Sequence, residues 1–155
     1  MNRNLLFLFF FLATISVINA IPHQFNKRTT VFEACPPIPG NPVDVTALTV
    51  TVTPDPIVSN QDATFTISGT AKDDIPTDAE VSIVYNTSDG FVIGTPFFTH
   101  FCADGDSCPV KQGDKFTRTL KAEAPTLPTA YSVTIIINTA NPEAVYGCAL
   151  ATVGA

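Results

Sequence analysis

Histidine and tryptophan are nearly or wholly missing from this chain of 155 residues, which holds two histidines and no tryptophan. One of the histidines, His23, lies in an N-terminal stretch that processing can remove, which leaves His100. No G-x-S-x-G or H-E-x-x-H motif is present, so neither the hydrolase triad nor the zinc-peptidase pair can be built from motifs of this kind. We therefore expect no enzymatic activity and no cofactor.

Positive charge is also scarce, because 8 lysines and arginines face 14 acidic residues and give a net charge of −6. Such a chain lacks the basic surface by which proteins hold nucleic acid, so no nucleic-acid partner is expected. The same deficit argues against stable attachment to anionic membranes by a polybasic patch. Any lipid binding then has to come mainly from apolar surface.

Only one long apolar run occurs, from Leu5 to Ile18, with Arg3 before it and Ala20 after it. This pattern predicts a secretory signal over residues 1–20, because the run is short for a membrane span. Residues 21–34 contain the dibasic pair Lys27-Arg28 and are interpreted as a pro-segment or a linker. Residues 35–155 are then one domain of an exported protein.

The four cysteines are Cys35, Cys102, Cys108 and Cys148. An even number in an exported chain predicts two disulfides, for which three pairings are formally possible. The turn-rich stretch between Cys102 and Cys108 favours a local bridge, which leaves Cys35 to pair with Cys148. A zinc site is disfavoured, since the spacing is not of the paired C-x-x-C kind and histidine is scarce; no metal is expected.

Short segments of alternating apolar and hydroxylated residues fill the domain, separated by Pro, Gly, Asn and Asp. The alternation has the period of β-strands, and thirteen prolines would interrupt most helices. We expect about seven strands, at residues 47–53, 64–70, 79–86, 91–99, 115–122, 131–138 and 145–153. Strands of this length and spacing predict an all-β sandwich.

One face of each strand is expected to point inward, and the inward residues form either a filled core or the walls of a slot. Alternation alone does not separate these two cases, because both require it. The residues predicted to contact a lipid in such a slot are Val50, Val52, Phe65, Ile67, Val81, Ile83, Tyr85, Phe97, Phe98, Phe116, Leu120, Tyr131, Val133, Ile135 and Ile137. Phe97 and Phe98, with Phe101, either guard the mouth of the slot or pack in the core.

Four of the five cations beyond residue 28 lie within residues 111–121. We single out Lys115 and Arg118 as contacts for a phosphate headgroup, with Arg118 pointing toward the slot because it shares parity with Phe116 and Leu120. A solvated strand face is the alternative. Asn86-Thr87-Ser88 is a glycosylation sequon, so Asn86 is a candidate acceptor of N-linked glycan.

Three motifs occur in an order that matches a known family. Cys102 precedes Cys108-Pro109-Val110-Lys111-Gln112-Gly113-Asp114; Leu127-Pro128-Thr129-Ala130-Tyr131-Ser132-Val133 begins an apolar strand; and Thr66-Ile67-Ser68-Gly69-Thr70-Ala71 ends another. With Cys148 near the end, the chain resembles the MD-2-related lipid-recognition (ML) family, which includes fungal phosphatidylglycerol/phosphatidylinositol transfer proteins and lysosomal cholesterol carriers. It lacks the third cysteine pair of some members.

The resemblance implies an immunoglobulin-like sandwich of two antiparallel sheets with an apolar slot between them. It also implies a monomer that holds a single lipid, phospholipid or sterol, touches membranes transiently and transfers the lipid between them. The protein would be secreted or lie in the lumen of the endosomal or vacuolar route. The rival hypothesis is a secreted adhesion or recognition module with a filled core.

Overall fold

A computed structural model of the chain describes residues 29–102, 108–141 and 143–154. The predicted signal segment lies outside these ranges. The described residues form nine strands and no helix: β1 (Phe32–Ala34), β2 (Thr46–Ala47), β3 (Thr49–Thr53), β4 (Asp62–Thr70), β5 (Glu80–Thr87), β6 (Phe97–His100), β7 (Lys115–Glu123), β8 (Tyr131–Ala140) and β9 (Glu143–Val153).

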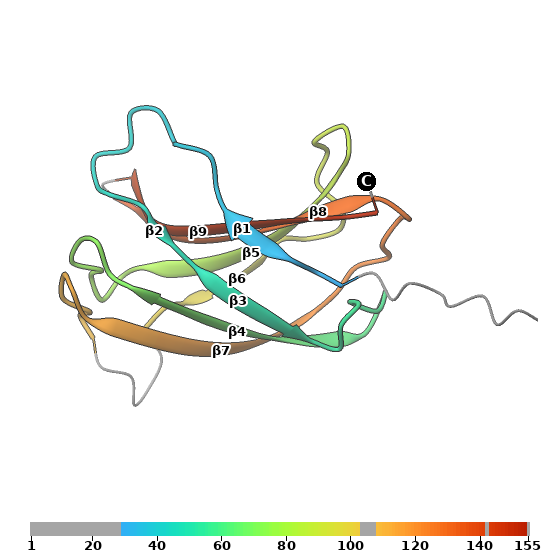
Figure 1. Cartoon of the computed structure of the whole chain (residues 1–155), viewed down its shortest axis with the longest axis horizontal. Helices are drawn as coiled ribbons and strands as arrows, with labels where there is room; N and C mark the ends of the chain where they lie inside the picture. The colour runs from blue at the N-terminus through green and yellow to red at the C-terminus, as the bar shows by residue number, and fades with distance from the viewer. Residues whose placement is uncertain (1–28, 103–107, 142, 155) are drawn as a thin grey trace, which may run out of the picture.

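The strands form two sheets that face each other as a sandwich (Figure 1). The larger sheet has the order β1-β9-β8-β5-β6, with β2 also paired to β9, and the smaller sheet has the order β3-β4-β7. Every pairing is antiparallel except the short parallel one between β2 and β9. The predicted all-β sandwich is therefore confirmed.

Alternation of apolar and hydroxylated residues sets the two faces of each sheet. Phe65 of β4 lies in register with Val52 and Leu120, while the next residue, Thr66, lies in register with Thr51 and Thr119. Because successive side chains of a strand point to opposite faces, the first set points to the core and the second to solvent. Strand β8 repeats the pattern, with buried and half-buried residues alternating through most of its length.

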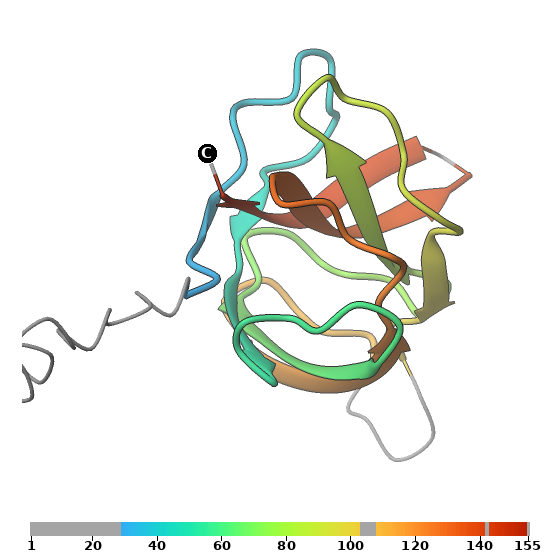
Figure 2. The same cartoon turned by 90° about the vertical axis from the view of Figure 1, so that its right-hand side faces the viewer.

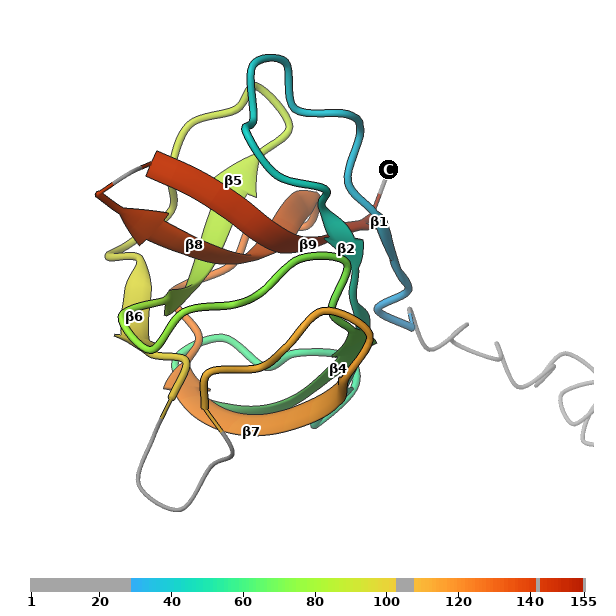
Figure 3. The same ribbon diagram turned by 90° about the vertical axis from the view of Figure 1, so that its left-hand side faces the viewer.

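Figures 2 and 3 view the sandwich from its two ends, which differ in the residues that they carry. One end, here called the tyrosine end, holds Tyr131 at the start of β8, Val153 opposite it, and the β3–β4 connection of residues 54–61. The other, here called the lysine end, holds Lys115 at the start of β7 and the Cys102–Cys108 disulfide. In Figure 1 the tyrosine end lies on the right and the lysine end on the left.

Both predicted disulfides are present, with Cα–Cα distances of 5.6 Å for Cys35–Cys148 and 5.9 Å for Cys102–Cys108. The longer bridge joins the segment after β1 to β9, and so links the N-terminal and C-terminal parts of the domain's chain. No free cysteine is found among the described residues.

Two segments differ from the sequence-based expectation. Only Phe97–His100 of the expected strand at residues 91–99 is a strand. Gly94 has a φ of +69° and Pro96 has no amide hydrogen, so the extended run is interrupted before Phe97. Residues 32–34, assigned above to the linker, form β1 and pair with β9; the folded region therefore begins before Cys35.

Candidate functional site

The space between the sheets is the candidate site, and most of the predicted lipid contacts border it. Twelve of the fifteen are buried, at 9% exposure or less: Val50, Val52, Phe65, Ile67, Val81, Ile83, Tyr85, Phe116, Tyr131, Val133, Ile135 and Ile137. Leu120 and Phe97 are half-buried and pack against this core. Ala149 and Val153 of β9 belong to the same buried cluster, so four strands of the larger sheet and all three of the smaller sheet contribute to one apolar interior.

Phe98 is the exception among these predictions. It pairs with Ser82 of β5, whereas its neighbour Phe97 pairs with Ile83. Since Ile83 points inward, Phe98 points outward, and its side chain is 60% exposed. The assignment of Phe98 to the slot wall is therefore wrong, because consecutive strand residues cannot share a face.

The interior is closed at its centre. Seven of the predicted contacts have no exposed surface: Phe65, Ile67, Val81, Ile83, Val133, Ile135 and Ile137. Packing is also tight where the chain passes from β2 to β3, because a methyl group added to Gly147 of β9 would lie 2.8 Å from Leu48 Cδ2. A guest between the sheets must therefore displace side chains that now touch one another.

Two tyrosines stand in this interior at the tyrosine end. The rings of Tyr85 and Tyr131 are 6.4 Å apart, tilted by 48°, and both side chains are buried. Burial raises the pKa of Tyr85 well above its ordinary range, with a smaller contribution from Tyr131. Burial also raises the pKa of Tyr131, and the negative charge of Asp55 adds to the effect. Both phenols are therefore neutral hydrogen-bond donors at physiological pH.

The Tyr85 hydroxyl makes no hydrogen bond within the described structure, although its oxygen is buried. A buried polar atom without a partner costs about 1–3 kcal/mol. Such atoms are uncommon in folded proteins and call for an explanation. Sequence periodicity placed Tyr85 on the inner face, but it carries no signal that the hydroxyl would be left alone there.

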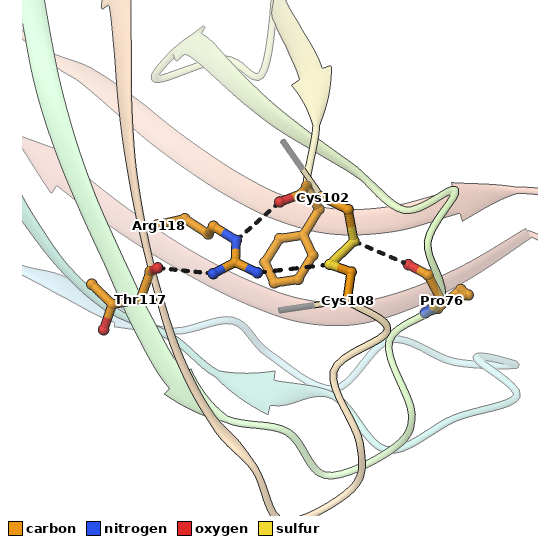
Figure 4. The surroundings of a disulfide bond; sticks show 6 residues. Pro76, Cys102, Cys108, Thr117 and Arg118 are labelled. Carbon is orange, nitrogen blue, oxygen red and sulfur yellow. Dashed lines mark hydrogen bonds between the residues drawn. A yellow bond between two sulfur atoms is a disulfide. The ribbon is translucent and has the colours of Figure 1, made fainter. Parts of the chain in front are cut away.

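Arg118 is held at the lysine end by contacts within the protein (Figure 4). Its Nε donates to the Phe101 carbonyl oxygen at 3.0 Å, one terminal nitrogen donates to the Thr117 carbonyl at 3.0 Å, and the other lies 3.7 Å from Cys108 Sγ. The guanidinium also lies 4.7 Å from the centre of the Phe101 ring. Arg118 does lie on the inner side of β7, as parity predicted, but its guanidinium is bonded to Phe101 and lies against Cys108 of the disulfide.

Lys115, the second predicted headgroup contact, is exposed and borders a surface hollow of about 460 Å³. Lys72, which sequence reasoning did not connect with it, borders the same hollow. The remaining walls carry hydroxyl groups and small or apolar side chains: Thr46, Ala47, Thr49, Ser68, Gly69, Thr70, Phe116 and Thr117. The lysine hollow, as we call it, brings together cations that lie 43 residues apart in sequence.

The other lysines of the described chain are engaged in ion pairs. Lys111 Nζ lies 2.8 Å from Asp74 Oδ2, and Lys121 Nζ lies 2.7 Å from Asp62 Oδ2. The Gln112 amide donates to the other Asp74 oxygen, and these two contacts hold the pKa of Asp74 below its ordinary value. These pairs leave Lys72 and Lys115 as the lysines better placed to meet an external anion.

Asn86, the predicted glycosylation site, is half-buried on β5, directly after Tyr85. Its backbone pairs with Ser132, on the outer face of the larger sheet, so a glycan there would project away from the interior. No membrane-spanning helix is found in the part of the chain that the structure describes. Over the same residues, no group of three or more His, Cys, Asp or Glu side chains is placed to bind a metal ion.

Residues 29–154 match the sequence model of the ML domain family. Among solved structures, the chain is similar to the Niemann-Pick type C2 protein from the Japanese carpenter ant, with a TM-score of 0.53 and 18% identity over 79% of this chain and 96% of that one. It is also similar to the C-terminal domain of Wzt, with a TM-score of 0.49 and 13% identity over 81% of this chain and 74% of that one. No curated protein matches the chain significantly.

Proposed function

The chain belongs to the ML domain family, a lipid-binding family, and from this premise we propose that it is a monomeric lipid carrier. It takes one lipid, phospholipid or sterol, between its sheets and transfers it between membranes. Two disulfides fit an exported protein. We propose that it acts outside the cell or in the lumen of the endosomal or vacuolar route, without catalysis.

The observation that carries the proposal is the continuous apolar interior bordered by seven strands of both sheets. Each methylene of a lipid moved from water into such surroundings gains roughly 0.8 kcal/mol, so a dozen are worth about 10 kcal/mol before the cost of opening the sandwich. The closed packing of residues such as Phe65 and Ile135 sets that cost. The sheets must separate, or side chains must change rotamer, for the lipid to enter.

The lysine hollow supports a role in contact with anionic lipid. Lys72 and Lys115 have hydroxyl groups around them, and such donors suit a phosphate. We propose Lys115 and Lys72 as the headgroup contacts. Arg118 then acts by holding Phe101 and the adjacent disulfide in place, because its guanidinium is already bonded to the Phe101 carbonyl.

One observation favours the rival function, a recognition module with a filled core. The central inward residues have 0% exposure, as expected of a sandwich whose interior needs no guest. In that case the exposed loops would bind a protein or glycan. The two functions differ in whether a lipid accompanies the protein.

Organic extraction of the purified protein followed by mass spectrometry decides between them. The carrier predicts one extracted lipid per protein molecule, and exchange of that lipid for a labelled one from vesicles. Absence of any extracted lipid, together with no uptake from phospholipid or sterol-containing vesicles, rejects the carrier and leaves the recognition module.

A further inference from the structure

The unpaired hydroxyl of Tyr85 has no role in a purely apolar slot. We propose that it donates a hydrogen bond to an uncharged oxygen of the bound lipid, a hydroxyl or an ester carbonyl, which then lies inside the sandwich and not at its mouth. The inference rests on the proposed function and identifies the chemistry that the interior recognises.

The described side chains at the tyrosine end help to explain why the Tyr85 hydroxyl has no partner among them. On the same inner side, the tyrosine end of the smaller sheet carries the cross-strand pair Ala63–Ala122, both buried, and alanine side chains cannot form hydrogen bonds. The neighbouring ring of Tyr131 lies at 6.4 Å between centroids. A lipid oxygen that reached this place would satisfy an atom that the fold leaves unsatisfied.

Electrostatics select an uncharged oxygen over an anionic one. Asp55 acts on Tyr131 with its negative charge, and an anion brought to the same end would be repelled and desolvated without a counter-charge. The nearest described cation along the strands, Lys121, lies on the outer face in a pair with Asp62. A phosphate is therefore disfavoured beside Tyr85.

The distance between the lysine hollow and Tyr85 distinguishes a phospholipid ligand from a sterol. Lys115 begins β7, whereas Glu123 ends it in register with Asp62, so a strand of nine residues, on the order of 25 Å, separates the two ends. A phospholipid with its phosphate at Lys115 would bring only acyl chain to Tyr85. A sterol that enters with its hydroxyl first would bring that oxygen to Tyr85.

The test compares wild type, Tyr85→Phe and the control Tyr146→Phe. Tyr146 is also buried but lies near the opposite end of β9, close to Glu143. Each protein is titrated with two matched pairs of probes: cholesterol and cholestane, which lacks the hydroxyl, and dioleoylphosphatidylcholine and its dialkyl ether analogue, which lacks the carbonyls. Bound lipid is counted by mass spectrometry after gel filtration, and stability is measured by urea unfolding of lipid-free protein.

Loss of one hydrogen bond of about 1 kcal/mol should weaken binding about fivefold. We expect Tyr85→Phe to show this loss for the oxygen-bearing member of a pair and not for its analogue, and the pair that responds names the source of the oxygen. Lipid-free Tyr85→Phe should be at least as stable as wild type, because an unsatisfied hydroxyl has been removed.

Equal effects on both members of each pair, or no effect on any, overturn the proposal. Lower stability of lipid-free Tyr85→Phe also overturns it, because the hydroxyl would then be bonded within the protein or to a buried water. Failure of the proposed function looks different, since wild type itself would retain none of the four probes.

Discussion

Arg118 and Phe101 are joined twice, by the hydrogen bond from Nε to the Phe101 carbonyl oxygen at 3.0 Å and by the guanidinium lying 4.7 Å from the ring centre. Phe101 precedes Cys102 directly, and its amide donates to the carbonyl of Ala79, the residue before β5 of the larger sheet. Because Arg118 belongs to β7 of the smaller sheet, this contact ties the two sheets together at the lysine end.

Arg118→Ala should lower the free energy of unfolding by about 2 kcal/mol, from the lost charged hydrogen bond and the lost cation–ring contact. Arg118→Lys should recover little of it, because an ammonium lacks the planar fork. Urea unfolding measures both. Lys121→Ala is the matched control on the same strand, since its exposed ion pair is worth less than about 1 kcal/mol. Equal losses at both positions would contradict a clamp at Arg118.

Removal of Lys115 or Lys72 should slow lipid transfer from anionic vesicles more than from neutral ones, because the lysine hollow loses one of its two cations. The effect should shrink in high salt, where exposed charges are screened. Lys121→Ala serves again as the control. If Lys115→Ala slows transfer equally from vesicles of both kinds, the headgroup assignment fails.

A lipid held between the sheets should quench an inward tryptophan and spare an outward one. The chain has no tryptophan, so Phe65→Trp and Thr66→Trp each introduce a single reporter on opposite faces of β4. Titration with brominated phospholipid or brominated sterol should quench the first strongly and the second weakly. Equal quenching of both would place the lipid on the outer surface, against the proposed slot.

Sequence alone predicted the architecture well, because the alternation along each strand and the spacing of neighbouring cysteines are local features of the chain. Alternation around Phe65 and Ile135 set the inner faces correctly, and the short spacing of Cys102 and Cys108 set the pairing. The errors at the expected strand of residues 91–99 and at Phe98 also have a local cause. At residues 91–99 the expected strand ran through Gly94 and Pro96, where the chain bends, so parity counted along it could not decide that Phe98 faces outward.

The site was harder to predict, because its features depend on contacts between distant segments. Lys72 and Lys115 border the same hollow because β4 pairs with β7, which places Thr70 opposite Lys115. The partner of Arg118 is a backbone carbonyl, which no side-chain pattern reveals. Likewise, whether the Tyr85 hydroxyl finds a hydrogen-bond partner depends on all the groups packed around it. Apolar periodicity does not distinguish that residue from any other inward side chain.

Alkaline pH should destabilise the protein partly through Tyr85. Its pKa is raised in the folded state from the ordinary value of 10.0, so the folded protein retains a proton that the unfolded chain releases above pH 10. The stability contributed by the neutral phenol is complete below that pH and is lost as the pH rises further. At pH 11 the loss from one such group approaches about 1.4 kcal/mol.

Urea unfolding at pH 8 and pH 11 measures that loss as the difference between wild type and Tyr85→Phe. The subtraction removes the titration of lysines and of the other tyrosines, which both proteins share. Tyr146→Phe serves as the comparison. An identical pH dependence in wild type and Tyr85→Phe would show that the Tyr85 phenol ionises freely in the folded protein, and therefore that the interior is open to water there.

The contact between Gly147 and Leu48 tests whether the sandwich is closed along β9. A methyl group at Gly147 would lie 2.8 Å from Leu48 Cδ2 and 3.2 Å from Ile137 Cδ1, so Gly147→Ala should cost about 1–3 kcal/mol in unfolding free energy. The double variant with Leu48→Val should regain part of that loss, because the shorter side chain makes room. If Gly147→Ala is as stable as wild type, the packing beside Gly147 has room for a further carbon, and a lipid chain could fit there; if it is destabilised and rescued as expected, this part of the interior is closed to a lipid.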